Sequence, residues 1–466
     1  MKSSRTIVFA LLVILFILPA MVQFYPVGES ESITAEKMYL ESYTHHDQIW
    51  IQSNEEFHAQ AALESWTGDG SKETPYVITG YLFDCESQPL RIWHTTVYWI
   101  FTDNIIDGVG SDIQCGSWIE NVTNGAIVDN EVHNRHAGLA IADIENFTIT
   151  DNYIHDCWGR GIELFGEMEK TLIQNNIIEN IGMSGIYSVT SRECTIKDNS
   201  ISNVDNNGIA LMGSSPGCIV TGNTISNCVA MGIMVAQCEN GNVSYNTVSN
   251  VVSQGVYLYS PVNCIVTGNI IHEVDGSGLR ILNSEFGEIT DNEISNCTEN
   301  GVFLGSGENT TVQWNLVSNS SVYSMNLGLH SSHIIVRYNT FIGNGETCQI
   351  YDAGTSNDVT FNFYDDWVSP DEDSNGFVDL PYCFDGSAEN KDEYPLVEAG
   401  IVPEITTTVT TTTTQTSTIT NTTTTTTYTN TGTTQSEQPM LMQLALVGGA
   451  VVVIVVISGI LILKRH

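Results

Sequence analysis

One asparagine recurs through most of this chain at intervals of 22 to 26 residues. A fixed period of this length indicates a repeat array, in which each unit packs against its neighbours and no unit folds alone. The array therefore replaces the two or three separate domains that a length of 466 residues would otherwise suggest. The repeating asparagines, called register asparagines below, are Asn104, Asn130, Asn152, Asn176, Asn199, Asn223, Asn246, Asn269, Asn292, Asn315, Asn339 and Asn362.

Three apolar positions accompany the register asparagine in each repeat. One lies three residues before it, one lies two residues after it, and one follows a glycine, as in Gly278-Leu279. β-Branched residues bounded by Gly, Asn and Ser are typical of short strands. Three strands in about 23 residues, with no helical stretch between them, predict an all-β chain: a right-handed parallel β-helix whose stacked coils share one core.

A leucine-rich repeat of similar period is the alternative fold. Its LxxNxI pattern resembles the IVTGNII at residues 265–271. That fold requires a helical return in each unit and much leucine, whereas this chain offers glycine and β-branched residues. The composition of the repeats therefore favours the β-helix.

Two asparagine columns and the cysteines are interpreted as structural. The register asparagine and a second asparagine four residues later are expected at corners, where they tolerate left-handed backbone and bond to the next coil. Cys157, Cys228 and Cys297 share an apolar column and are expected to be buried as small hydrophobes. A disulfide is more plausible outside the regular coils, between Cys85 and Cys115 or between Cys348 and Cys383.

Both ends of the chain carry membrane signals. Lys2 and Arg5 precede the apolar run 7–20, which is typical of a cleaved secretory signal; an uncleaved anchor is the alternative. The uncharged run 444–463 is long enough to span a bilayer and ends in cations, which favour the cytoplasmic side. A Thr-rich tract before it is typical of an O-glycosylated stalk. The predicted segments are a signal peptide (1–24), an N-terminal cap with the first coils (25–103), the β-helix (104–365), a C-terminal cap (366–400), the stalk (401–439), a transmembrane helix (440–463) and a cytoplasmic tail (464–466).

The charge of the chain limits its partners. Fifty-four acidic and fifteen basic residues give a formal charge of -39, which repels nucleic acid and anionic membrane surfaces. The sequence therefore predicts a single-pass cell-surface protein with an extracellular N-terminal domain. Sequons compatible with a glycoprotein occur at Asn121, Asn146, Asn242, Asn296, Asn309, Asn319 and Asn421.

The two ends of the stack are expected to be closed. At the front, Ser53 and Glu56 have capping-box spacing ahead of an apolar pattern that extends to Leu63, which predicts a helix. At the back, DEDSNGFVD places oxygen ligands at loop positions 1, 3, 5, 7 and 9 and a glycine at position 6. Tyr382 stands where an EF-hand has glutamate, so the pattern predicts a calcium-like site but no complete EF-hand. Its ligands would be Asp371, Asp373, Asn375, the carbonyl of Phe377, and Asp379, and no organic cofactor is expected.

These segments resemble a known family. The coils, the GDGSKETPYVITG stretch and the stretch 370–396 (PDEDSNGFVDLPYCFDGSAENKDEYPL) are similar to the NosD-like and carbohydrate-binding/sugar-hydrolysis (CASH) group, archaeal surface type. The resemblance covers about residues 50–396. It implies a right-handed β-helix outside the cytoplasm. It implies no particular reaction, because the group mixes enzymes, binding proteins and proteins of unknown role.

The strand that follows the glycine carries an outward position between two inward ones. Aromatic side chains with a few charges on such a face suit sugar rings, so the face is predicted to bind a polysaccharide or glycan. Cross-strand packing under a loop or against a partner is the alternative. The predicted ligand-binding residues are Glu163, Phe165, Tyr187, Tyr257, Tyr259, Arg280 and Phe303.

Catalysis is a weaker hypothesis. A polysaccharide lyase or epimerase needs a base beside a cation, and Tyr257 and Arg280 occupy the same slot in adjacent coils. Glu163 and His136 are further candidates, from a second group that contains His133, His136, His155, Asp156, Arg160 and Glu163. The Asp-Pro-His, Gly-His-Gly, Arg-Ile-Lys and Arg-x-Pro-x-x-Arg signatures of enzymes on this fold are absent. Copper handling would need denser His and Met clusters. Two functions therefore remain open: a surface protein that binds or processes a glycan, and a structural or adhesive envelope component whose partners would be other envelope proteins.

Overall fold

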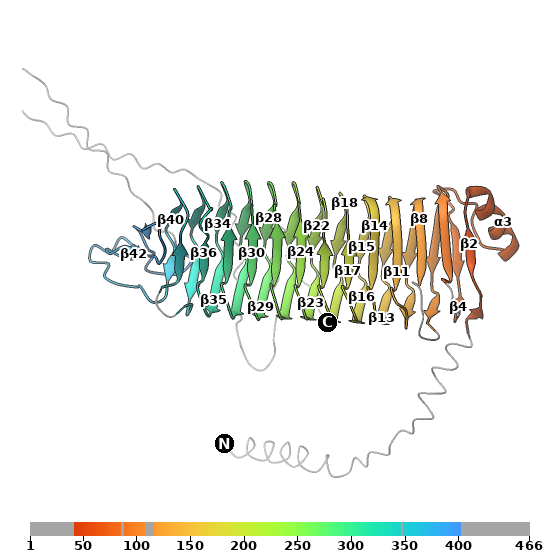
Figure 1. Ribbon diagram of the computed structural model, residues 1–466, viewed down its shortest axis with the longest axis horizontal. Coiled ribbons are helices and arrows are strands. Elements are labelled where there is room, and N and C mark those ends of the chain that lie inside the picture. Colours follow the sequence, from red (N-terminus) through yellow and green to blue (C-terminus); the bar gives the residue numbers. More distant parts are fainter. Residues whose placement is uncertain (1–41, 85–87, 109–115, 346–347, 402–466) are drawn as a thin grey trace, which may run out of the picture. The chain divides into compact units, whose positions relative to one another are not determined.

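The computed structural model describes residues 42–84, 88–108, 116–345 and 348–401 of the chain. Within these ranges the chain winds into stacked coils whose strands form three parallel sheets along one axis (Figure 1). The predicted signal peptide, the stalk after residue 401, the membrane helix, the tail and both Cys85 and Cys115 lie outside these ranges. No helix in the described ranges is long and apolar enough to cross a bilayer.

Sheet A contains fourteen strands, each in parallel register with the strand of the next coil. They are β1 (Thr44–His45), β4 (Tyr81–Phe83), β7 (Ile105–Asp107), β10 (Glu131–His133), β13 (Tyr153–Cys157), β16 (Ile177–Ile181), β20 (Ser200–Val204), β23 (Thr224–Cys228), β26 (Thr247–Val251), β29 (Ile270–Val274), β32 (Glu293–Cys297), β35 (Leu316–Ser320), β38 (Thr340–Ile342) and β41 (Phe363–Tyr364).

Sheet B also contains fourteen strands, one of which, β18, pairs only with β14. They are β2 (Ile49–Ile51), β5 (Leu90–Thr95), β8 (Ser117–Thr123), β11 (Leu139–Glu145), β14 (Ile162–Glu169), β17 (Ile186–Ser188), β18 (Ser191–Arg192), β21 (Ile209–Leu211), β24 (Ile233–Ala236), β27 (Val256–Tyr259), β30 (Leu279–Leu282), β33 (Val302–Gly305), β36 (Met325–Leu327) and β39 (Ile350–Asp352).

Sheet C contains thirteen strands. They are β3 (Tyr76–Thr79), β6 (Trp99–Thr102), β9 (Gly125–Val128), β12 (Thr148–Thr150), β15 (Leu172–Gln174), β19 (Thr195–Lys197), β22 (Ile219–Thr221), β25 (Asn242–Ser244), β28 (Ile265–Thr267), β31 (Glu288–Thr290), β34 (Thr311–Gln313), β37 (Ile335–Arg337) and β40 (Asp358–Thr360).

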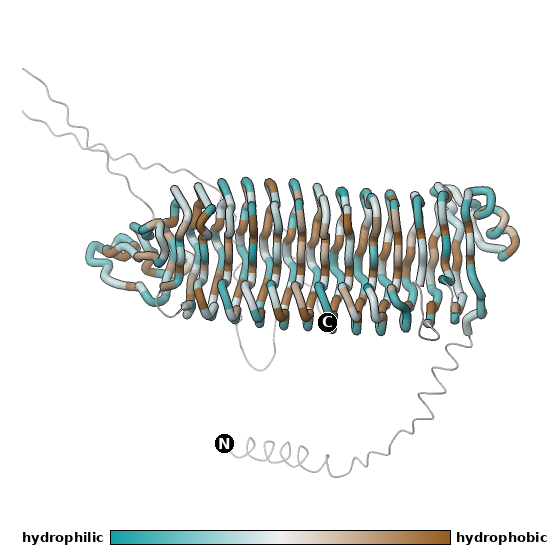
Figure 2. The backbone as a smooth tube through the Cα atoms, in the orientation of Figure 1, coloured by the Kyte–Doolittle hydropathy of each residue, from teal (hydrophilic) through white to brown (hydrophobic). Residues whose placement is uncertain are grey.

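The three apolar positions of each repeat form the core, as the repeat predicts. In one coil they are Val266 on sheet C, Ile271 on sheet A and Leu279 on sheet B, and all three are buried. Each lies beside its equivalent in the next coil, so the core is continuous along the axis. Hydrophobic and hydrophilic residues recur in the same places from coil to coil (Figure 2). The leucine-rich-repeat alternative is therefore wrong.

The register asparagines form an internal hydrogen-bonded ladder. The amide nitrogen Nδ2 of Asn269 donates to Oδ1 of Asn292 (2.9 Å) and to the carbonyl of Val243 (2.9 Å), and the backbone N–H of Asn269 also donates to Oδ1 of Asn292 (3.0 Å). Equivalent bonds connect every register asparagine from the first to the last. The second asparagine has left-handed backbone, as predicted, for example Asn227 (φ 55°). The register asparagine does not: the left-handed residue there is the one before it, such as Tyr245 (φ 54°).

The cysteines agree only in part with the sequence prediction. Cys157, Cys228 and Cys297 lie in one inward column with isoleucine and valine and are buried, as predicted. Cys348 and Cys383 are both free thiols, and Sγ of Cys348 donates to the carbonyl of Cys383 (3.2 Å). The predicted disulfide between them is wrong, because the two segments meet through a thiol–backbone hydrogen bond.

The predicted front helix is α3 (Asn54–Glu64), which lies at one end of the stack beside β2 (Figure 1). Oγ of Ser53 accepts a hydrogen bond from the backbone N–H of Glu56 (3.2 Å), as the capping box requires. The Glu56 carboxylate accepts in return from the backbone N–H of Gln52 (2.8 Å). The fully buried ring of Phe57 stacks on Tyr76, so the helix joins the core of the first coils.

The far end of the asparagine ladder meets Asp392, in a C-terminal segment that we define as residues 366–400. The buried Asp392 carboxylate accepts from the backbone N–H groups of Phe361 (3.1 Å) and Asn362 (2.9 Å) and from the hydroxyl of Tyr364 (3.2 Å). It thus takes the place that the next register asparagine would hold. Burial raises the pKa of Asp392 to about 6, although the backbone donors oppose this shift.

Candidate functional site

The outward positions of sheet B form one continuous column, as the sequence predicts. Parallel register places Tyr257 directly beside Arg280, and Arg280 directly beside Phe303. We call the part of this row from Trp118 to Phe303 the sheet-B column; in coil order it contains Trp118, Ala140, Glu163, Tyr187, Ala210, Met234, Tyr257, Arg280 and Phe303.

Arg280 is a half-exposed cation with no acidic partner in the described part of the chain. Its guanidinium carbon lies 4.5 Å from the ring centroid of Phe303, in cation–π geometry. Burial raises the pKa of the neighbouring Tyr257, and Arg280 opposes this effect only in part. Tyr257 is therefore protonated at neutral pH, where it acts as a hydrogen-bond donor rather than a general base.

Glu163 differs from the prediction, which placed it on an exposed ligand face. The residue is only 6% exposed, and its carboxylate forms an ion pair with Arg160. The guanidinium of Arg160 lies in turn 3.7 Å from the ring centroid of Tyr187. The carboxylate is covered because Arg160, three residues earlier at the corner, folds back over the sheet, so Glu163 and part of Tyr187 are occupied by internal contacts.

The remaining predicted face residues are partly accessible. Tyr259 is 40% exposed next to Tyr257, on the same strand. Phe165 is half-buried and stacks on Trp118 with ring centroids 6.2 Å apart. Tyr257, Tyr259, Arg280 and Phe303 thus form one aromatic surface with a single cation, whereas Phe165 belongs to a separate aromatic pair several coils away.

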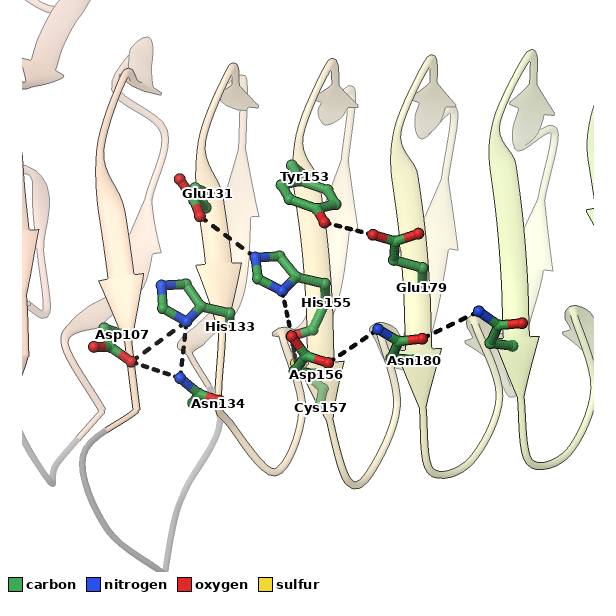
Figure 3. Close-up of polar contacts among 11 residues, drawn as sticks. Asp107, Glu131, His133, Asn134, Tyr153, His155, Asp156, Cys157, Glu179 and Asn180 are labelled. Carbon is green, nitrogen blue, oxygen red and sulfur yellow. Dashed lines mark hydrogen bonds and ion pairs between the residues drawn. The ribbon is translucent and has the colours of Figure 1, made fainter. Parts of the chain in front are cut away.

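A second group of ionisable residues gathers on the outer surface of sheet A, on β7, β10, β13 and β16 (Figure 3). His155 lies at its centre. Nδ1 of His155 is 2.7 Å from Oδ2 of Asp156, and Nε2 is 3.4 Å from Oε1 of Glu131. The ring of His155 stacks on Tyr153 with centroids 4.1 Å apart. This sheet-A cluster consists of Asp107, Glu131, His133, Tyr153, His155, Asp156 and Glu179.

The members of the sheet-A cluster differ in protonation. Tyr153 donates its hydroxyl to Oε1 of Glu179 (2.5 Å), and this bond to a carboxylate raises the pKa of Tyr153 to about 12. The hydrogen bond from His155 lowers the pKa of Asp156. Burial lowers the pKa of His133, whose Nδ1 accepts from the amide of Asn134 (2.9 Å). The cluster therefore combines a neutral His133 imidazole, a strongly held Tyr153 phenolic proton and an ionised Asp156 carboxylate on one surface.

The structure divides the second group that the sequence suggested. His133, His155 and Asp156 come together on sheet A, but Arg160 and Glu163 lie beyond the corner, on and beside sheet B. His136 is exposed at the preceding corner, so it belongs to neither group.

Four members of the cluster were missed by the sequence prediction: Asp107, Glu131, Tyr153 and Glu179. Register alignment carries the signal for them, since the matching outward positions of β20, β23 and β26 hold only serine and threonine.

In the acidic loop at residues 371–379, carboxylates accept hydrogen bonds from backbone N–H groups of the same loop. Asp371 accepts from the N–H groups of Asn375 (3.1 Å) and Gly376 (3.2 Å), and Asp379 accepts from Glu372 N–H (2.7 Å). The described residues contain no group of three or more His, Cys, Asp or Glu side chains arranged to hold a metal ion. Calcium binding by this loop therefore stays a prediction. It requires the carboxylates to rotate away from these N–H groups and toward the ion.

Comparison with known proteins places the chain by fold. Residues 90–240 and 231–369 match the family described as the right-handed β-helix region. A search of curated proteins found no match.

Solved structures with similar folds come from several organisms. The A-module of a mannuronan C-5 epimerase from Azotobacter vinelandii is 14% identical over 62% of this chain and 88% of its own, with a TM-score of 0.48. The catalytic unit of an α-1,3-glucanase from Streptomyces thermodiastaticus is 14% identical over 61% of this chain and 60% of its own, with a TM-score of 0.32. A lacto-N-biosidase from Eubacterium ramulus is 10% identical over 71% of this chain and 69% of its own, with a TM-score of 0.41. At such identities the likeness concerns the fold alone. Because the two family matches together span more than half of the chain, it belongs to the right-handed β-helix family.

Proposed function

We propose that this chain is a membrane-anchored, extracellular β-helix protein that binds acidic polysaccharide on the outer surface of sheet B. Arg280 is the observation that carries the proposal. In a chain with a formal charge of -39, this cation has no carboxylate partner within the described ranges and lies on the ring of Phe303 instead. A guanidinium held in this way is available for a carboxylate of a ligand, and charge-assisted bonds of that kind are strong.

The aromatic neighbours of Arg280 suit the rest of a sugar. Tyr259 is exposed and Tyr257 half-exposed on the adjacent strand β27, and Phe303 follows on β33. Sugar rings pack their C–H faces on aromatic side chains and form hydrogen bonds at their edges. Adjacent strands are about 4.8 Å apart, so an extended polymer lying along the stack would meet one row of side chains per coil.

Alanine substitutions of Tyr257 and Arg280 test this proposal. Each is expected to weaken binding of the full-length chain to polygalacturonate about tenfold, since a hydrogen bond to a charged group contributes about 1.5–3 kcal/mol. The melting temperature should not change, because both side chains lie on the surface. Affinity electrophoresis in gels containing the polymer measures the effect.

Arg337→Ala is the matched control for Arg280→Ala. Arg337 also lies over an aromatic ring, 5.7 Å from the centroid of Tyr338, but it belongs to sheet C. Its removal should leave binding unchanged. Equal losses in the two arginine variants would show a non-specific charge effect and contradict the proposal.

Repeating the gels and the melting experiment with EDTA tests whether the 371–379 loop binds calcium. A lower affinity for the polymer or a lower melting temperature would support an ion in this loop, and no change in either would contradict it.

Anchoring is proposed from segments 1–24 and 440–463 of the sequence. Retention of the full-length chain in carbonate-washed membranes would support it, and release would contradict it. A structural or adhesive role in the envelope is the alternative, and absence of binding to every glycan of an array would favour that role.

The sheet-A cluster favours a second candidate function, acid–base catalysis on a polysaccharide. His155 contacts two carboxylates, and Tyr153 holds a proton against a third, which is the composition of a proton-transfer site. If the cluster is catalytic, the unmodified chain incubated with polygalacturonate in D₂O should either introduce deuterium into the polymer or cleave it, and NMR detects both products. His155→Ala or Tyr153→Phe should abolish this reaction. His272→Ala is the control, because His272 occupies the same outward column on β29, far from the cluster. Absence of any product from the unmodified chain would exclude catalysis on this polymer.

A further inference from the structure

The corner between sheets A and B contains a groove of about 570 Å³ that the sheet-B proposal does not use. It follows the stack over four coils, from Trp158 to Val229, a length of roughly 14 Å at the usual strand spacing. Its floor is apolar and buried. The lining residues are Asp156, Cys157, Trp158, Asn180, Ile181, Gly182, Asn203, Val204, Asp205, Asn227 and Val229.

A chain of side-chain amides forms one wall of this corner groove. The amide of Asn227 donates to Asn203 (3.0 Å), Asn203 donates to Asn180 (3.1 Å), and Asn180 donates to Oδ1 of Asp156 (3.0 Å; Figure 3). All three asparagines are exposed, and each uses one amide N–H for this chain and keeps a second. The wall therefore offers one spare donor per coil.

The opposite wall combines an aromatic ring with a free carboxylate. Trp158 is 44% exposed, and Asp205 is exposed without a side-chain hydrogen bond or ion pair in the described ranges. Gly182 leaves the space between them open. A Cβ on Gly182 would lie 2.4 Å from the backbone oxygen of Trp158, so the close approach of these two backbone segments requires glycine at position 182. Because glycine has no side chain, this part of the groove stays open.

The charge of the lining determines which ligand fits. None of the eleven lining residues carries a positive charge, and two are aspartates. A uronate or sulfate would be repelled there, whereas hydroxyl groups can donate to the carboxylates and accept from the amides. The spacing of donors, one per coil, is close to the length of one sugar in an extended hexopyranose chain. A basic peptide could satisfy the aspartates, but it would leave the row of amide donors without acceptors.

We propose that the corner groove is a second binding site, specific for an uncharged, extended polysaccharide chain, with Trp158 stacking on one sugar ring. The site shares no residue with the sheet-B column, so it goes beyond the function proposed above. Experiments can therefore disprove binding at one of the two sites without disproving binding at the other. Asp156 belongs to both the groove and the sheet-A cluster, so a sugar at the Trp158 end would lie next to His155.

The test uses the full-length chain and isothermal titration with two sets of hexasaccharides. The uncharged set is cello-, xylo-, manno- and laminarihexaose, and the charged set is hexagalacturonate and hexamannuronate. We expect at least one uncharged ligand to bind, about tenfold more weakly after Trp158→Ala and several-fold more weakly after Asn203→Gly. Glycine suits the left-handed backbone of Asn203 (φ 55°), so this variant keeps the corner intact.

Trp50→Ala is the matched control, since Trp50 is a similarly exposed tryptophan (49%) on the first coil. It and Arg280→Ala should leave binding of the uncharged ligand unchanged. The groove proposal would be overturned if an uncharged hexasaccharide bound equally well to the unmodified chain and to the Trp158 and Asn203 variants. It would also be overturned if polylysine bound more tightly than every sugar and its binding was weakened by these two substitutions. Binding of the charged set alone, lost in Arg280→Ala, would overturn the groove and leave the sheet-B proposal standing. Binding of neither set would overturn both.

Discussion

Replacing Asn223 with alanine is expected to lower the free energy of unfolding by about 3–5 kcal/mol. Asn223 is fully buried in the middle of the register ladder. Its Nδ2 group donates to the carbonyls of Ile196 (3.0 Å) and Thr221 (3.1 Å), and its Oδ1 accepts from the backbone N–H (3.0 Å) and the side chain (2.9 Å) of Asn199. Alanine removes all of these bonds at once and leaves the buried N–H of Asn199 without its side-chain acceptor, whereas the Asn199 amide and the Thr221 carbonyl keep other partners. Each buried polar group left without a partner costs about 1–3 kcal/mol.

The control for this variant lies four residues away in the same coil. Asn227 also bonds to asparagine in the neighbouring coil, but it is exposed and has left-handed backbone (φ 55°). Asn227→Gly keeps that backbone and exposes the freed groups to water, so it should cost less than about 1 kcal/mol. Urea unfolding followed by circular dichroism measures both variants. Equal losses would contradict the assignment of the register asparagine to the interior.

Removing the Asp392 carboxyl is expected to flatten the dependence of stability on pH between 4 and 7. The pKa of Asp392 rises from 3.8 in the unfolded chain to about 6 in the folded one. The folded state therefore holds this proton over a range in which the unfolded state has released it. Stability from this group is full below about pH 4 and is lost as the pH rises through about 6, a difference of about 3 kcal/mol.

Asp392→Asn removes the titration while keeping the size of the side chain. The decline in unfolding free energy from pH 4 to pH 7 should be smaller in this variant than in the unmodified chain by about 3 kcal/mol. Asp358→Asn is the control, because Asp358 is exposed on β40 of the last coil and its change should be small. An identical pH dependence in the Asp392 variant and the unmodified chain would show that the carboxylate is not buried at the end of the ladder.

The regular part of this fold could be predicted from the sequence because the same residue types return at the same place in every coil. A period of about 23 residues, three apolar positions and one asparagine together specify three sheets and the register between coils. The alignment also predicts the sheet-B column, with Tyr257, Arg280 and Phe303 in line. The left-handed backbone of the second asparagine was predicted correctly, but at the register position it was assigned one residue late, since the register asparagine serves the ladder instead.

The contacts that depart from the repeat could not be predicted in this way. Arg160 covers Glu163 because a corner residue folds back over the next strand, and no periodic pattern records that choice. Asp392 joins the ladder from a segment with no repeat, so only the three-dimensional structure shows which acid meets Asn362. The sheet-A cluster is an intermediate case. Its residues align in columns of the repeat, but they can be recognised as a possible site only by comparison with later coils, which have serine and threonine at the same positions.

We propose that Arg280 recognises a carboxylate on a polysaccharide. The most direct test compares polygalacturonate with the same polymer after reduction of its carboxyl groups, each bound to the unmodified full-length chain and to Arg280→Ala. We expect the unmodified chain to prefer the acidic polymer about tenfold and Arg280→Ala to lose this preference. An equal preference in both proteins, or none in the unmodified chain, would contradict it.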